Sequence, residues 1–136
     1  MPKGVVVVVT RCTDPERDEE YNRWYTHTHL PDMSKARGFV RARRFRNLDP
    51  NGPGQYMALY EFDSPDLKES AKDLSRLGLE AFKAGRHIDC IIGMRSQAAG
   101  VWQEIDPREY KPLVHLDYPR TPPEALRRSI EASLRR

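Results

Sequence analysis

A run of five valines near the start of the chain constrains its fold more than any other feature. The segment GVVVVVTRC (residues 4–12) has the length of a strand and is β-branched through most of it, which predicts a β-strand. Its apolar residues do not alternate with polar ones, as they do in a sheet that has one face in water. Both faces of this strand therefore need an apolar cover.

The remainder of residues 1–106 alternates between helix and strand patterns. Two helices are expected, each opened by a capping residue followed by proline, at Asp14–Pro15 and at Ser64–Pro65. Pro31 predicts that the first helix stops or kinks at Leu30, with one further turn ending at Gly38. The expected strands are residues 4–12, 39–48, 55–63 and 99–106, and the segment 87–97 fits no single pattern.

This order of elements is β-α-β-β-α-β, the ferredoxin-like unit of the α+β class. It predicts a four-stranded antiparallel sheet with both helices on one face, in a domain that spans residues 1–106. Nothing within these residues supplies a lid for the second face. The economical cover is a second copy of the chain, packed sheet against sheet, so we expect a homodimer.

Residues 107–136 form a Pro-punctuated, basic C-terminal extension. They hold seven Lys/Arg and four Asp/Glu, which is the whole of the +3 net charge. The segment PPEALRRSIEASLRR predicts a short helix with Leu126, Ile130 and Leu134 on one side. Because the core is neutral, and the strand QYMALYEFD lacks the glycine of an RNA-recognition motif, we expect no nucleic-acid partner.

The sequence also bears on compartment and redox state. No apolar run approaches the roughly 20 residues of a membrane span, and the N-terminal valine run is too short for a signal peptide. We therefore expect a cytoplasmic protein that does not bind membranes. Cys12 and Cys90 form no Cys-x-x-Cys motif and are expected to be reduced thiols rather than a disulfide framework.

The segment RWYTHTHLPDM (residues 23–33) places two histidines near the end of the first helix. Side chains two residues apart on a helix point about 200° away from each other, so His27 and His29 cannot share a metal ion. We expect one of them, His29, to face the interior beside Tyr25, and His27 to lie on the surface. No metal site and no cofactor are predicted.

The longer segment EEYNRWYTHTHLPDM resembles the first helix of the EthD-like branch of the dimeric α+β barrel superfamily. Tyr21, Trp24, Tyr25, His29 and Pro31 stand at the positions of the aromatic residues and the His-x-Pro of that branch. The resemblance implies two ferredoxin-like subunits that pack their sheets into a barrel, with a cavity between sheet and helices. That superfamily holds cyclases, isomerases, cofactor-free monooxygenases, dehydratases, haem-degrading enzymes and proteins without assigned chemistry.

These considerations predict a small cofactor-independent enzyme of lyase, cyclase or isomerase type, with a small aromatic or polyketide-like carbonyl compound as substrate. An imidazole with a pKa near 6.5 exchanges protons at neutral pH, so His29 is the expected general acid/base. The alternatives are a non-catalytic ligand-binding or stress-related scaffold and a cofactor-free monooxygenase. The candidate catalytic residues are His29 and His87, and the candidate substrate-binding residues are Trp24, Tyr25, Tyr60 and Arg44.

Overall fold

The structure is a computed structural model that describes residues 3–112 and 123–135. Two units are present, Met1–Ile105 and Asp106–Arg136. The first unit holds a five-stranded antiparallel sheet in the order β2-β3-β1, with β4 and β5 both paired to the free edge of β1. The strands are β1 (Lys3–Cys12), β2 (Phe39–Arg46), β3 (Tyr56–Asp63), β4 (Ile91–Gly93) and β5 (Gly100–Gln103).

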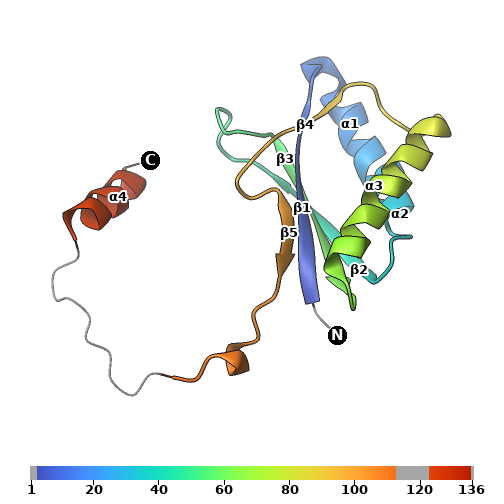
Figure 1. Cartoon of the computed structure of the whole chain (residues 1–136). Coiled ribbons are helices and arrows are strands. Elements are labelled where there is room, and N and C mark those ends of the chain that lie inside the picture. The colour runs from blue at the N-terminus through green and yellow to red at the C-terminus, as the bar shows by residue number, and fades with distance from the viewer. Residues whose placement is uncertain (1–2, 113–122, 136) are drawn as a thin grey trace. The chain divides into compact units, whose positions relative to one another are not determined.

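The helices of the first unit lie on one side of this sheet (Figure 1). A short 3-10 turn, η1 (Pro15–Arg17), is capped by Asp14, whose carboxylate accepts from the Glu16 amide. The following helical segments are α1 (Asp18–Trp24), the π-helical turn η2 (Tyr25–His29), α2 (Leu30–Met33) and α3 (Leu67–Lys83). The strand order and the one-sided helices confirm the predicted ferredoxin-like, α+β fold.

The last strand of the motif is divided in two, where the sequence predicted one strand over residues 99–106. β4 pairs with the Thr10–Cys12 end of β1, and β5 pairs with its Gly4–Val7 end. The chain re-enters the ladder at Gly100 with φ +141°, a conformation that residues with a side chain rarely adopt. The ambiguous segment 87–97 therefore contains β4, and the sheet has five strands rather than four.

The second long helix also begins later than predicted. Its N-cap is Asp66, whose Oδ1 accepts hydrogen bonds from the Lys68 and Glu69 amides at 3.1 and 3.2 Å. The predicted cap, Ser64, is fully buried, and its hydroxyl bonds with that of Ser70 at 2.8 Å instead. Aspartate is an effective N-cap, so the helix starts at the carboxylate rather than at the proline before it.

The two faces of the sheet have different surroundings. On the helix-covered face, β3 presents four buried side chains, Tyr56, Ala58, Tyr60 and Phe62. The intervening residues of β3 point to the opposite side, where the strand register aligns them with the odd-numbered residues of β1. We call this opposite side the open face and define it by Val7, Val9, Phe45, Met57, Leu59 and Trp102. Phe45 is 41% exposed and Trp102 is 51% exposed.

The second unit holds a 3-10 turn, η3 (Pro107–Glu109), and helix α4 (Glu124–Leu134). The apolar side chains predicted for this helix, Leu126, Ile130 and Leu134, are exposed. Residues 113–122 and 136 of the C-terminal extension lie outside the described residues. None of the helices in the described part of the chain has the length and apolar character needed to cross a membrane.

Candidate functional site

The first helix passes through Pro31 by widening into a π-helical turn. Leu30 donates its amide hydrogen to the Tyr25 carbonyl, five residues back, and Pro31 then lies in the first turn of α2, where a missing N–H costs little. Continuation of the helix to Met33 shows that Leu30 is not its end. The helix therefore does not stop at Pro31, and it accommodates the proline by a local π turn.

The π turn determines what His29 touches. Residues five apart lie roughly 140° apart around a regular α-helix, but here the His29 ring stacks on Trp24 with ring centroids 4.8 Å apart. The edge of the His29 ring also meets Tyr25 at 4.7 Å. His27 is exposed, so the two histidines diverge as their spacing predicts. His29 is thus held between two aromatic rings of its own helix.

Burial changes the protonation of His29. Removal of the ring from water is the main cause that lowers its pKa from 6.5 to about 4; the Asp32 carboxylate opposes this shift, and His87 and Arg44 add to it. The imidazole is therefore neutral at neutral pH and offers a lone pair. Its pKa lies well below the value near 6.5 expected from the sequence, because the aromatic walls disfavour the imidazolium.

Two tyrosine hydroxyls meet beside this histidine. Tyr25 Oη and Tyr60 Oη are 3.2 Å apart, and both side chains are at most 2% exposed. Burial raises the pKa of Tyr60 to about 12 and raises the pKa of Tyr25 well above its usual value of 10. Both hydroxyls therefore stay protonated at neutral pH and remain able to donate hydrogen bonds.

Arg44, on edge strand β2, reaches over the same tyrosine. Its guanidinium carbon lies 4.5 Å from the Tyr25 ring centroid, within cation–π range. Nη2 donates to Asn22 Oδ1 at 2.8 Å, and Nη1 donates to Thr26 Oγ1 at 3.0 Å. Among the described residues no carboxylate forms an ion pair with Arg44. By contrast Arg41, on the same strand, lies on the open face and pairs with Glu61.

A partly buried polar network that the sequence did not indicate includes Asn22, a hydrogen-bond partner of Arg44. Tyr56 Oη donates to Asp18 Oδ1 at 2.6 Å, and Asn22 Nδ2 donates to Tyr56 Oη at 3.0 Å. Asn22 thereby joins the guanidinium of Arg44 to the carboxylate of Asp18. The available signal was the i, i+4 spacing of Asp18 and Asn22, but their link to Tyr56 depends on which face of β3 meets the helices.

The remaining candidates lie at the rim of this cluster. Trp24 donates its indole N–H to the Arg86 carbonyl at 2.8 Å. His87 is exposed, and its ring meets the edge of Trp24 at a centroid distance of 6.1 Å. His29 and His87 are thus both neighbours of Trp24. The structure brings together Trp24, Tyr25, His29, Tyr60, Arg44 and His87 around the middle of the first helix.

A large surface hollow lies away from the histidine cluster. Its volume is about 690 Å³, and it is lined by residues at the end of the sheet that include Lys3, Val40, Arg41, Glu61 and Trp102. The histidine cluster does not line it, because these residues belong to the open face and the adjoining sheet end. Within residues 3–112 and 123–135, no group of three or more His, Cys, Asp or Glu side chains gathers as metal ligands would.

Comparison with known proteins places this geometry in context. No family model matches the sequence. Core atranone cluster (CAC) protein 1 of Stachybotrys chlorohalonatus (strain IBT 40285) is 29% identical over 115 residues, which cover 84% of this chain but only 45% of that protein. The chain therefore spans less than half the length of this curated relative.

Solved structures show where the fold recurs. A Bordetella bronchiseptica protein, provisionally named an antibiotic biosynthesis monooxygenase, is 13% identical with a TM-score of 0.52, covering 78% of this chain and 98% of its own. An EthD family protein of Bacillus halodurans is 17% identical with a TM-score of 0.46, covering 77% of this chain and 100% of its own. This chain shares its ferredoxin-like fold with the Bordetella protein. The fold class predicted from the order of helices and strands is thus confirmed, and the chemistry rests on the site itself.

Proposed function

We propose that this protein catalyses proton transfer on a small aromatic or polyketide-like carbonyl compound, with His29 as the general base. The observation that carries the proposal is that Tyr25 is flanked by a neutral imidazole and by a guanidinium without a carboxylate partner among the described residues. A neutral base removes a proton next to a carbonyl, and the adjacent cation stabilises the enolate oxygen that forms. No metal or cofactor is required for this step.

Each residue of the cluster has a role in this scheme. His29 takes the proton and returns it at another position, which gives isomerisation, cyclisation or elimination according to the substrate. Arg44 holds the oxyanion, and the hydroxyls of Tyr25 and Tyr60 donate hydrogen bonds to it, because both stay protonated. Trp24 forms an apolar wall that suits a flat ring. His87, at the rim, is a proposed second proton carrier between His29 and water.

The named relative supports a biosynthetic setting for this chemistry. It is described as a protein of the core atranone cluster, and proton transfer to and from carbon is a common step in the reactions of carbonyl compounds. A second candidate is cofactor-free oxygenation, to which the provisional name of the Bordetella protein points. Both begin with a carbanion made by His29, and they differ in whether O₂ then accepts electrons from that carbanion.

We further propose that two copies pair through their open faces. Phe45 and Trp102 expose large apolar surfaces there, and Met57 and Leu59 are only half-buried within one chain. Burial of such a patch is favourable at about 25 cal/mol per Å² of apolar surface. A sheet-to-sheet dimer would give a particle of about 32 kDa, twice the chain mass of 15.8 kDa.

Hydrogen–deuterium exchange at carbon tests the proton-transfer step directly. In D₂O, NMR follows loss of the methyl-ketone signal of 2′-hydroxyacetophenone, which carries both a carbonyl and a phenol that Arg44 could hold. We expect the wild type to accelerate exchange and His29→Ala to lose about 10²–10⁴-fold of that rate. His27→Ala is the matched control and retains it. Equal exchange by His29→Ala and the wild type would refute the assignment, and O₂ consumption with the same ketone would favour oxygenation.

A further inference from the structure

The two cysteines, which are 78 positions apart in the sequence, lie side by side in the fold. Cys12 ends β1, and Cys90 immediately precedes β4, where its carbonyl accepts the Thr13 amide at 2.8 Å. Their sulfur atoms are 3.7 Å apart, and the side chains are 4% and 3% exposed. A disulfide requires about 2.05 Å between sulfurs, so the two sulfurs are close neighbours but must still move toward each other to form a bond.

Cys90 belongs to residues 86–90, a segment that packs along the first helix. We call this segment the strap. The Arg86 side chain forms a two-pronged ion pair with Asp32 at 2.8 and 3.0 Å. At the other end, Asp89 accepts from Arg17 Nη1 at 2.6 Å, and Ile88 between them is 6% exposed. The strap therefore lies along the helix from α2 back to η1.

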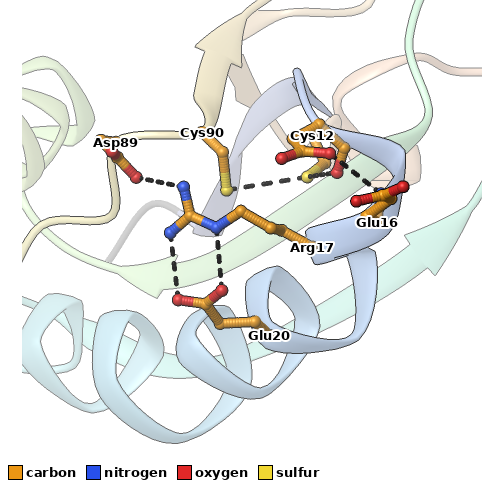
Figure 2. Close-up of polar contacts among 7 residues, drawn as sticks. Cys12, Glu16, Arg17, Glu20, Asp89 and Cys90 are labelled. Carbon is orange, nitrogen blue, oxygen red and sulfur yellow. Dashed lines mark hydrogen bonds and ion pairs between the residues drawn. The ribbon is translucent and has the colours of Figure 1, made fainter.

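Figure 2 shows how the cysteine pair is placed within these contacts. Arg17 lies between Asp89 and Glu20 and donates to both carboxylates, so one guanidinium joins the strap to α1. The two sulfurs point toward each other behind this ion-pair cluster. The charged contacts join the strap to the first helix. The cysteine pair joins the strap to β1, and this contact can become covalent.

We propose that Cys12 and Cys90 are a redox-modification site, at which a hydroperoxide converts the two thiols into a disulfide that locks the strap. The first thiol attacks the peroxide, the O–O bond breaks, one oxygen stays on sulfur as a sulfenic acid, and the other leaves as water or alcohol. The second thiol then displaces the hydroxyl from that sulfur, releasing water and forming the S–S bond. The two thiols lose two electrons and two protons in total, and the peroxide takes them up.

Burial sets the conditions for this reaction. It raises the pKa of the Cys90 thiol, with a further contribution from its contact with Cys12, so the closed strap holds the Cys90 thiol in the less reactive protonated form. Opening of the strap breaks the exposed Arg86–Asp32 pair and admits the small oxidant. Because the sulfurs are neighbours, the sulfenic acid meets its partner thiol on reclosure before a second oxidant molecule arrives.

A locked strap would affect the histidine cluster, because the Arg86 carbonyl holds the indole of Trp24 on which His29 stacks. This consequence is structural and is measurable without substrate. Amide hydrogen exchange in residues 86–90 reports strap opening, and a covalent bond at Cys90 should slow it at least about tenfold relative to reduced protein.

Mass spectrometry of native full-length protein treated with hydrogen peroxide tests the proposal. We expect a loss of about 2 Da, a peptide pair joining Cys12 to Cys90, and recovery of the starting mass with dithiothreitol. Cys12→Ser and Cys90→Ser should each prevent the cross-link. Since a buried Cys→Ser change can impair folding, the wild type before and after dithiothreitol serves as an independent comparison of strap exchange. Separate sulfinic acids, disulfides between molecules, or unchanged exchange in the cross-linked protein would each overturn the proposal.

Discussion

The two faces of one sheet have opposite chemistry. The helix-covered face holds buried phenols, a neutral histidine and an arginine that donates hydrogen bonds to Asn22 and Thr26. The open face holds exposed Phe45 and Trp102 among aliphatic side chains, with its arginine Arg41 in an ordinary ion pair. Polar groups on the covered face are costly unless they are bonded, which is typical of sites kept for function. The open face exposes apolar side chains of the kind found at protein interaction surfaces.

Two adjacent residues of β3 point to opposite faces of the sheet. Substitutions of these two residues should give the largest effects on stability and assembly. Tyr60 points into the covered face and Leu59 into the open one. We expect Tyr60→Ala to lower the free energy of unfolding by about 3–5 kcal/mol at any protein concentration, because it leaves a cavity. Leu59→Asp should instead remove the dependence of the urea unfolding midpoint on protein concentration, because it places a charge in the proposed dimer interface.

Denaturation by urea at two protein concentrations, with light scattering for mass, distinguishes the two outcomes. The wild type should scatter as a particle of about 32 kDa and Leu59→Asp as one of 15.8 kDa. A wild-type protein that is monomeric at micromolar concentration would contradict the proposed role of the open face while leaving the covered-face prediction intact.

The pH dependence of the free energy of unfolding tests the helix-covered face by itself. Because burial lowers the pKa of His29 to about 4, against about 6.5 in the unfolded chain, the unfolded state binds more protons between these values. The contribution of His29 is therefore fully present above about pH 6.5 and is lost as pH falls toward 4. The total loss is about 3 kcal/mol.

Comparison with His29→Gln isolates this effect from the carboxylates that titrate at lower pH. Urea unfolding between pH 7.5 and 5 should show the wild type losing stability faster than His29→Gln. His27→Gln, at the exposed histidine two residues away, should follow the wild type. Identical slopes for the wild type and His29→Gln would mean that the ring is solvated. The activity proposed for His29 should likewise persist below pH 6, since the imidazole stays neutral there.

The fold was predictable because local signals agree with it. The valine run, the proline-marked helix starts and the DPNGPG turn (residues 49–54) each specify an element, and alternation on β3 assigns its faces. The helix start at Leu67 was misplaced because Ser64 and Asp66 are both suitable caps by sequence. The division of the last strand depends on pairing with β1, which periodicity along residues 87–106 does not report.

The candidate residues lie together in the structure, but their contacts could not be predicted from the sequence. His29 was found from its motif position, yet its stacking on Trp24 depends on the π turn, which follows from Pro31 only once the helix is known to continue. Its pKa could not be predicted, because desolvation depends on surrounding tertiary contacts. The closeness of Cys12 and Cys90 required the register of β1 with β4.

The smallest expected effect compares two arginines of β2 that point to opposite faces. Arg44→Gln removes hydrogen bonds to Asn22 and Thr26 and the cation–π contact with Tyr25, so it should lower the free energy of unfolding by about 1–2 kcal/mol. Arg41→Gln removes an ion pair with Glu61 whose arginine side chain is 61% exposed, so it should lower the free energy of unfolding less than Arg44→Gln does, because water screens the pair.

Matched urea titrations of the two single variants and the double variant measure this difference. The two changes should be additive, because the side chains lie on opposite sides of the sheet and share no partner. An equal or larger loss for Arg41→Gln would indicate that the open-face arginine is desolvated in the dimer. Repetition at a protein concentration low enough to dissociate a dimer decides this: the Arg41 effect should then fall, while the Arg44 effect, which arises within one chain, should stay the same.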